Sequence, residues 1–388
     1  MNVELMYSRR KSGNYFTLPS SHLLTAVLRR KQTTSIWSQV SGTANISTNE
    51  YYVTTTEEEN RGPVPVIILT YMRSGSSFTG QILQAAPSTF YWFEPMHKLL
   101  VNFTPGNTFQ FLNGVSRAFR SRDDVSTLTA SSIASCHLDR LPVRVLTDGF
   151  LGHGNRDTSK SFISCLQSFR RLASDPKMPL RRCILDYKET CLKSNHVIIK
   201  TIRMTMASME DMLVKHPRLK IVHLIRDPRA TVRSQKTLGE FRDDKHENVT
   251  EKIISFCKRV LRDVLDREDF QRRFPNRIIP VFYEDIAKNP IEYSKTIYQF
   301  LGMEFSKESE EKIFQMTSSG TEQENCGVLC TNRPNSSVEA NEWRHQVTID
   351  FVKTVDKACA GLYNKLGYKT VPNKTSLFDL NYQLRNLQ

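Results

Sequence analysis

Residues Pro65–Thr70 read Pro-Val-Ile-Ile-Leu-Thr, and Arg73–Phe78, two residues later, read Arg-Ser-Gly-Ser-Ser-Phe. A continuous β-branched apolar run is typical of a strand that is buried on both faces of a parallel sheet. The small residues lead into a helical pattern over Phe78–Ala86, which stops before Pro87. This stretch therefore predicts a strand, a loop rich in Gly and Ser, and a helix.

Three more strands are predicted downstream, each followed by a helix. The strands lie at His196–Lys200, Leu219–Ile225 and Arg277–Tyr283, and the helices begin near Ala207, Ala230 and Pro290. The last helix is expected to end at Leu301, closed by Gly302. This alternation predicts the α/β class, with one domain built on a central parallel sheet flanked by helices. Residues 99–180 show no clear alternation, and we expect helices and acceptor-binding loops there.

The composition divides the 388-residue chain into three parts. Residues 1–62 are rich in Ser, Thr, Asn and charge and are expected to form a flexible stem or N-terminal extension. Residues 63–370 are expected to form the folded domain, and 371–388 a C-terminal tail. The net charge of +14 favours polyanionic partners. No zinc-finger or RNA-binding pattern accompanies this charge, so nucleic acid is not expected as a partner.

Cysteines and sequons bear on the compartment. The sequence has eight cysteines and five Asn-x-Ser/Thr sequons, a combination that favours the lumen of the secretory pathway. Two cysteine pairs are close in sequence, Cys183 with Cys191 and Cys326 with Cys330, and are expected to be disulfides in an oxidising lumen or free thiols in the cytosol. A membrane span needs about 20 apolar residues, and the best N-terminal candidate, Leu23–Leu28, is far shorter. Either the protein is soluble where it is made, or this chain lacks its membrane anchor.

The loop after the first strand has the composition of a phosphate-binding cradle. Its backbone N–H groups and the following helix N-terminus would face one point, which attracts anions. Gly75 allows close approach, Ser74, Ser76 and Ser77 add hydroxyl donors, and Arg73 adds a cation. The Walker A pattern is absent, which counts against an ATPase. The alternative is an ordinary turn between a strand and a helix.

A second basic loop follows the third strand. Arg226, Arg229 and Arg233 lie close together at a turn and helix start, where they would repel one another unless an anion or Asp227 neutralises them. The Asp227-Pro228 pair fixes the turn into the helix. Both basic loops follow strands whose carboxyl ends share one edge of the sheet, where ligands of such folds bind. The alternative is a solvated basic helix start.

Together these motifs resemble the Golgi carbohydrate sulfotransferases that act on the 6-hydroxyl of galactose, N-acetylglucosamine and N-acetylgalactosamine. Arg73–Phe78 is similar to their 5′-phosphosulfate-binding loop, and Leu224–Ser234 to their 3′-phosphate-binding segment. The resemblance extends from about Val64 to Tyr368. Further matches are Phe93-Glu94-Pro95, Lys200-Thr201-Ile202-Arg203, Tyr283-Glu284-Asp285 and Trp343-Arg344.

The resemblance implies transfer of a sulfuryl group from 3′-phosphoadenosine 5′-phosphosulfate (PAPS), without a metal, to a sugar hydroxyl. Arg73 and Glu94 would be catalytic, Arg73 at the leaving group and Glu94 as general base. His97 is the alternative base, and Glu94 in a structural ion pair is the alternative role. The residues implied in donor binding are Arg73, Ser74, Gly75, Ser76, Ser77, Phe78, Arg226, Asp227, Pro228, Arg229 and Ser234. Weaker expectations place Lys200 and Arg203 in the acceptor channel and Arg333 near the nucleotide.

The implied partner is a glycan acceptor of the keratan, chondroitin or mucin type, in the Golgi lumen, and a homodimer is compatible with the family. The family's N-terminal membrane anchor is not seen in this sequence. Two other classes remain open: a non-catalytic basic glycan-binding protein and a nucleotide-dependent kinase of P-loop-like fold.

Overall fold

The computed structural model describes residues 62–153, 158–170, 177–241, 248–318 and 335–386. By its internal contacts the chain divides into Met1–Thr56 and Glu57–Gln388. Only the second unit contains described residues, and the account below concerns that unit. Arg333, Cys326 and Cys330 lie outside the described residues. The stem expected at 1–62 also lies outside them, except for its last residue.

The domain is organised around a parallel sheet with strand order β2-β5-β1-β6-β7. In chain order these strands are β1 (Val64–Leu69), β2 (Thr89–Phe93), β5 (His196–Thr201), β6 (Lys220–Ile225) and β7 (Ile278–Phe282). All pairings between neighbours are parallel. The predicted α/β class with a central parallel sheet is therefore confirmed, and β2 is a strand that the sequence analysis did not recognise.

Strand β1 lies at the centre of the sheet and is buried on both faces. Val66, Ile67, Ile68 and Leu69 are all 0 % exposed. Ile67 and Leu69 pack in one apolar cluster, whereas Val66 and Ile68 pack in a second cluster on the opposite face. Each such buried side chain contributes roughly 1.5–3 kcal/mol relative to an exposed one. This two-sided burial explains why the β1 sequence is continuously apolar rather than alternating.

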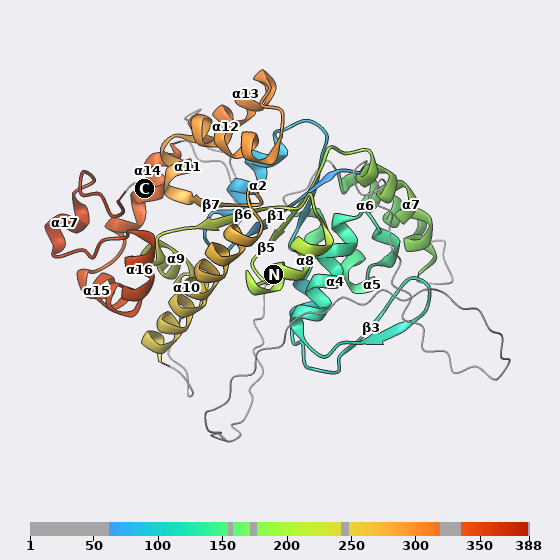
Figure 1. Ribbon diagram of the computed structural model, residues 1–388, viewed down its shortest axis with the longest axis horizontal. Coiled ribbons are helices and arrows are strands. Elements are labelled where there is room, and N and C mark those ends of the chain that lie inside the picture. The colour runs from blue at the N-terminus through green and yellow to red at the C-terminus, as the bar shows by residue number, and fades with distance from the viewer. Residues whose placement is uncertain (1–61, 154–157, 171–176, 242–247, 319–334, 387–388) are drawn as a thin grey trace, which may run out of the picture. The chain divides into compact units, whose positions relative to one another are not determined.

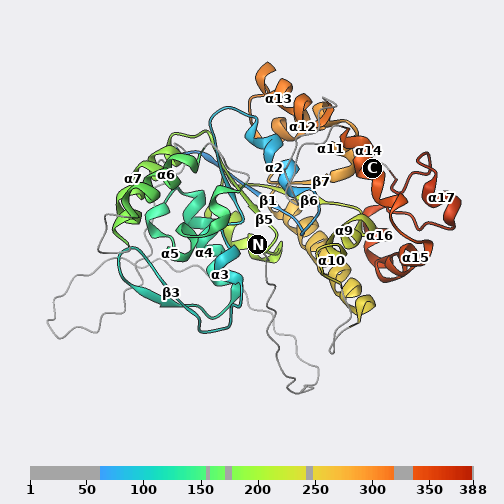
Figure 2. The same ribbon diagram turned by 180° about the vertical axis from the view of Figure 1, so that it is seen from behind.

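Helices cover both faces of the sheet (Figures 1 and 2). One face is covered by α2 (Ser76–Gln84), α11 (Tyr283–Lys288), α12 (Pro290–Leu301) and α13 (Lys307–Ser318). The apolar cluster on the other face includes side chains from α4 (Arg122–Ala134) and α7 (Met178–Leu192). Helix α12 ends at Gly302, whose φ of 71° is the left-handed conformation typical of a C-terminal glycine, as the sequence predicts.

The remaining elements complete the flanking layers. A short antiparallel hairpin, β3 (Thr108–Gln110) with β4 (Ser116–Ala118), lies in the region where helices and acceptor loops were expected. The other helices with described bounds are α3 (His97–Leu100), α5 (Val143–Leu146), α6 (Lys160–Arg170), α8 (Glu210–Lys215), α9 (Pro228–Lys236), α10 (Val249–Arg273), α14 (Ser336–Asn341), α15 (Ile349–Ala358), α16 (Ala360–Leu366) and α17 (Lys374–Phe378).

Three disulfides among the described residues join separate elements of the domain. They pair Cys136 with Cys191, Cys165 with Cys183, and Cys257 with Cys359. The pairing of Cys183 with Cys191 that sequence proximity favoured is wrong. Both residues lie on α7, and eight residues of helix rise about 12 Å, whereas bonded cysteines need Cα atoms within roughly 7 Å.

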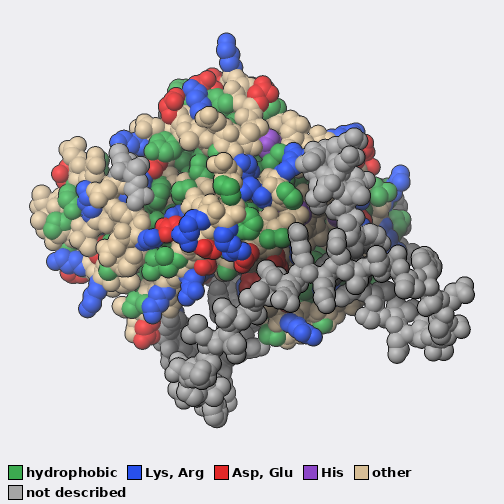
Figure 3. Space-filling view, in the orientation of Figure 1, with side chains coloured by type: hydrophobic (Ala, Val, Ile, Leu, Met, Phe, Trp, Pro, Cys, Tyr) green, Lys and Arg blue, Asp and Glu red, His purple; other side chains and the backbone are tan. Residues whose placement is uncertain are grey.

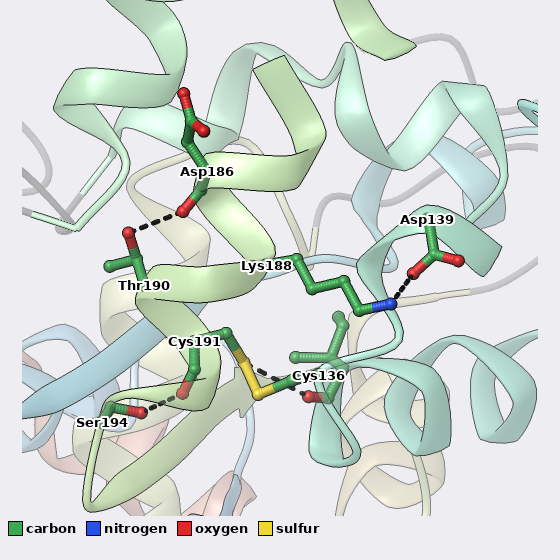
Figure 4. The surroundings of a disulfide bond; sticks show 8 residues. Cys136, Asp139, Asp186, Lys188, Thr190, Cys191 and Ser194 are labelled. Atoms are coloured by element: carbon green, nitrogen blue, oxygen red, sulfur yellow. Dashed lines mark hydrogen bonds and ion pairs between the residues drawn. A yellow bond between two sulfur atoms is a disulfide. The ribbon is translucent and has the colours of Figure 1, made fainter. Parts of the chain in front are cut away.

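The Cys136–Cys191 bond ties the end of α7 to the turn after α4, with a Cα–Cα distance of 5.7 Å (Figure 4). Beside it, Lys188 Nζ contacts Asp139 Oδ1 at 2.8 Å. These contacts tie α7 to the segment that follows α4.

The face shown in Figure 3 carries no single basic patch, and the described residues include no membrane-spanning helix. On the face shown in Figure 3, Lys and Arg side chains are spread over the surface among Asp and Glu side chains. No helix in the described part of the chain combines the length and apolarity that crossing a membrane requires. Residues of the expected C-terminal tail pack onto the domain, since Val371 and Leu377 are buried beside Trp343.

Candidate active site

A cleft of about 230 Å³ lies at the carboxyl ends of the parallel strands. This is the edge at which α/β sheets bind ligands. Its lining residues come from loops after all five strands and from two further segments. They are Met72, Arg73, Gly75, Ser76, Ser77, Phe78, Phe93, Glu94, Phe150, Lys200, Ile202, Arg203, Arg226, Leu238 and Tyr283.

The loop between β1 and α2 has a backbone shaped for close approach. Arg73 and Gly75 both have positive φ, of 64° and 84°. A Cβ on Gly75 would lie 2.1 Å from Tyr283 Cδ2, so only glycine fits there. Gly75 is also the N-cap of α2, and no side chain caps this helix end. The first N–H groups of α2 therefore face the cleft region without a capping side chain, together with the partial positive charge of the helix.

Helix α9 holds this loop from the neighbouring strand end. Arg73 Nε donates to Ser234 Oγ at 2.9 Å, and Gln235 Nε2 donates to the carbonyl of Met72 at 2.7 Å. Arg226 Nη1 donates to the carbonyl of Arg73 at 3.1 Å. The two basic segments that the sequence places 153 residues apart thus form one site.

Arg226 lies over an aromatic ring at the cleft wall. Its guanidinium carbon is 4.5 Å from the ring centroid of Tyr283. Its buried Nε makes no hydrogen bond with any residue that the structure describes. The stacked cation is thus held in place while retaining donor capacity.

Five of the residues that the sequence grouped with the donor site lie outside the cleft lining: Ser74, Asp227, Pro228, Arg229 and Ser234. Arg229 is 0 % exposed, with Asp227 Oδ2 at 2.8 Å and Asp356 Oδ1 at 3.4 Å. Burial alone would lower the pKa of Arg229, but the charges of Asp227, Tyr363 and Asp356 and the hydrogen bond to Asp227 together outweigh burial and raise it. Its guanidinium therefore pairs with buried carboxylates and not with a ligand in the cleft. One of these partners, Asp356, lies on α15 and could not be recognised from the local sequence. Ser74 is buried, with 1 % of its surface exposed.

Glu94 sits at the other wall of the cleft as part of a buried ion pair. Its φ is 49° and its exposure is 2 %. Lys200 Nζ donates to Glu94 Oε1 at 2.7 Å, and the amide of Ile202 donates to the same oxygen at 3.0 Å. Arg203 Nε lies 3.4 Å from Oε2. Oε2 accepts no hydrogen bond from the described residues, and burial lowers the pKa of Lys200 despite the nearby carboxylate.

His97, the alternative base, makes different contacts. Its Nδ1 lies 3.2 Å from Asp148, and its ring stacks on Phe150 with centroids 4.0 Å apart. His97 is not among the lining residues, whereas Phe150 is. These contacts favour a supporting role for His97 beneath the cleft wall.

Comparison with known proteins identifies the family to which this architecture belongs. Residues 63–369 match the family model of the sulfotransferase domain. The chain belongs to the sulfotransferase family. Curated relatives of this sulfotransferase include human carbohydrate sulfotransferase 3, with 24 % identity over 82 % of this chain and 70 % of the relative. Zebrafish (Danio rerio) carbohydrate sulfotransferase 1 is 27 % identical over 82 % of this chain and 81 % of the relative. The resemblance seen in the motifs is thus confirmed.

Solved structures with a similar chain course are also sulfotransferases. The sulfotransferase domain of the Synechococcus PCC 7002 olefin synthase has 17 % identity and a TM-score of 0.43, covering 76 % of this chain and 95 % of that one. A mouse sulfotransferase complexed with PAP has 14 % identity and a TM-score of 0.38, covering 81 % and 88 %. The family assignment of this sulfotransferase rests on the sequence match over residues 63–369.

Several cleft residues of this sulfotransferase carried little or no signal in the sequence. Tyr283 was noted only as part of a short motif, and Phe150 and Leu238 were not recognised. Phe150 lies in a short 3-10 turn whose approach to β2 depends on long-range packing. The Lys200–Glu94 contact had only half of its basis in the sequence, because Lys200 ends a predicted strand whereas the strand before Glu94 was not recognised.

Proposed function

We propose that this sulfotransferase uses PAPS to sulfate a sugar, at the 6-hydroxyl of N-acetylglucosamine, galactose or N-acetylgalactosamine in a glycan. The observation that carries the proposal is the meeting of Arg73, Arg226 and Glu94 around one cleft. Two cations beside an uncapped helix N-terminus suit an anionic donor, and a carboxylate opposite them suits deprotonation of a hydroxyl. The printed names of the curated relatives support a carbohydrate acceptor.

In this proposal the first turn of α2, with the backbone of Ser74–Phe78, holds the 5′-phosphate of PAPS. Arg226 and Ser234 hold the 3′-phosphate, and Asp227-Pro228 shapes the turn that carries Arg226. Arg229 acts from behind, because its guanidinium anchors Asp227. No group of three or more potential metal-ligating acidic, His or Cys side chains occurs in the described ranges.

The transfer is an in-line displacement at sulfur. The acceptor oxygen forms a bond to sulfur while the bond from sulfur to the bridging oxygen of the 5′-phosphosulfate breaks. The acceptor proton passes to Glu94 Oε2, the oxygen that accepts no hydrogen bond from described residues. Arg73 stabilises the charge that develops on the departing phosphate. Lys200 and Arg203 hold Glu94 at the cleft wall.

The decisive experiment is sulfate transfer from radiolabelled PAPS to a panel of keratan, chondroitin and mucin-type oligosaccharides, with the position of sulfation mapped. Arg73→Ala is expected to lower transfer at least 100-fold, the scale on which such charge-stabilising groups act. Arg272→Ala, which removes a 74 % exposed arginine on α10, is the control and is expected to leave transfer unchanged. If the chain binds PAP but transfers sulfate to none of these glycans, the proposed class of acceptor is refuted.

Glu94→Gln separates catalysis from donor binding. We expect this variant to retain binding of PAP, the desulfated form of PAPS, as measured by calorimetry, because Gln still accepts the hydrogen bond from the Ile202 amide. We expect it to lose sulfate transfer, because Gln cannot take up the acceptor proton. Full transfer by this variant would show that Glu94 has only its ion-pair role. The three disulfides support a secretory-pathway lumen, for which we propose the Golgi.

A further inference from the structure

A second cavity of about 320 Å³ is lined by residues that directly follow two cleft residues along the chain. The two cavities share a wall formed by two dipeptides at neighbouring strand ends. Arg226 and Tyr283 line the cleft, whereas Asp227 and Glu284, the next residues along the chain, line the second cavity. A substitution at Asp227 or Glu284 therefore lies next in the chain to a residue that lines the cleft.

Glu284 joins the two strand ends that form the wall. Its Oε1 accepts a hydrogen bond from the amide of Asp227 at 2.7 Å. Its Oε2 lies 3.5 Å from the Tyr368 hydroxyl, which donates to it. On the front side, the guanidinium of Arg226 rests on the Tyr283 ring. Glu284 thus fixes the peptide between Arg226 and Asp227 relative to the aromatic platform on which Arg226 lies.

We propose that Glu284 is a positioning residue for the sulfate donor, acting through the Asp227 amide to hold Arg226 at the nucleotide side of the cleft. This inference rests on the proposed function, since it concerns how the donor is bound. Glu284 touches neither reacting group. It acts through the backbone hydrogen bond and through its charge behind Arg226.

The charge of Glu284 gives this role a dependence on pH. Burial, followed by the charge of Asp227, raises the pKa of Glu284 to about 7, and the charge of Arg226 acts in the opposite direction. Below that pH the neutral carboxyl still accepts the hydrogen bond from the Asp227 amide. It no longer competes with an anionic donor for the positive charge of Arg226. An anionic donor is therefore expected to bind more tightly as the pH falls.

Other charged and titratable groups surround this carboxyl, and the test must separate them from it. The α9 side contributes Asp227, and α11 contributes Asp285, which pairs with Arg385 of the C-terminal segment. The groups that face Glu284 or line the same cavity are Arg226, Asp227, Asp285, Lys288, Arg344, Tyr368, Tyr382 and Arg385. Replacing Glu284 alone leaves all of these in place.

The experiment measures PAP affinity by calorimetry at pH 6, 7 and 8 for the full chain and three variants. Glu284→Ala is expected to weaken PAP binding about tenfold at pH 7, as loss of a charge-assisted hydrogen bond implies. Glu284→Gln retains the acceptor and is expected to bind within about twofold of the wild type at pH 6. Glu292→Gln, which changes a 75 % exposed carboxylate on α12, is the matched control.

The pH series carries the decisive comparison. Because the secondary ionisation of phosphate near pH 6 affects every variant equally, the ratio of wild-type to Glu284→Gln affinity isolates Glu284. We expect this ratio to rise roughly threefold or more from pH 8 to pH 6. A constant ratio refutes the role of the Glu284 charge, and unchanged PAP affinity in a folded Glu284→Ala variant refutes the role of its hydrogen bond to the Asp227 amide. Either result leaves the proposed function standing, whereas a wild type that binds no PAP refutes the proposed function.

Discussion

The buried contact between Lys200 and Glu94 offers the sharpest test of how the cleft wall is held together. Both side chains are at least 96 % buried, and Nζ lies 2.7 Å from Oε1. Lys200→Met keeps the length and apolar volume of the side chain but removes its charge. The carboxylate is then left with the Ile202 amide and with Arg203 at 3.4 Å.

The magnitude follows from the partners that remain. Removing one member of a buried ion pair costs about 3–5 kcal/mol, because the other charge stays buried without compensation. Since Arg203 still offers partial compensation, we expect the lower end, about 3 kcal/mol. The double variant Lys200→Met/Glu94→Gln removes both charges and is expected to cost only about 1 kcal/mol. The two single losses should therefore not be additive.

The assay is equilibrium urea unfolding with the disulfides intact, analysed as a double-mutant cycle. An exposed ion pair of the same kind, Lys193 with Glu189, supplies the control cycle. Its coupling energy is expected to stay below about 0.5 kcal/mol. If the Lys200 and Glu94 substitutions proved additive, the charges would not be compensating each other, and the account of this wall would be refuted.

Three further outcomes are expected. Gly75→Ala should abolish PAP binding in calorimetry, because its Cβ would overlap Tyr283 and its φ of 84° disfavours any other residue; normal binding would show that the loop is not rigid. Glu284→Gln should raise the melting temperature at pH 8 and leave it unchanged at pH 4. The pKa of Glu284 is raised from 4.5 to about 7 in the folded state, so its ionised form destabilises the fold above pH 7, whereas at pH 4 the carboxyl is neutral. Replacing Cys257 and Cys359 by Ser should lower the free energy of unfolding by about 4–5 kcal/mol, as expected for a link across 102 residues; a loss below 1 kcal/mol would contradict this.

Local sequence features specified most of the sheet and its helix ends. The apolar run of β1 and the stop at Gly302 are readable because each depends on neighbouring residues alone. Strand β2 was not recognised for the converse reason. It is a five-residue aromatic segment, Thr89–Phe93, whose strand conformation depends on pairing with β5, more than 100 residues downstream.

The arginines after β6 show why residue type does not determine the role of a side chain. Arg226 and Arg229 are three residues apart and were grouped as anion-binding residues. Arg226 stacks at the cleft, whereas Arg229 points inward to meet Asp356, 127 residues away. The acidic partner that separates their roles belongs to another part of the chain, so the local motif could not reveal it.

A buried network under the cleft makes the same point about the catalytic groups themselves. Asp263 on α10 accepts hydrogen bonds from the Tyr71 hydroxyl at 2.9 Å and from the Met206 amide at 2.8 Å. One turn earlier, Arg259 covers the Tyr71 ring and donates to the carbonyl of Ile202. Tyr71 leads into the Arg73 loop, and Ile202 holds Glu94. One helix thus contacts both of the segments that carry the two proposed catalytic residues, although α10 carries no motif of its own. The motifs point to the groups proposed to react, whereas the side chains that link their segments belong to no motif.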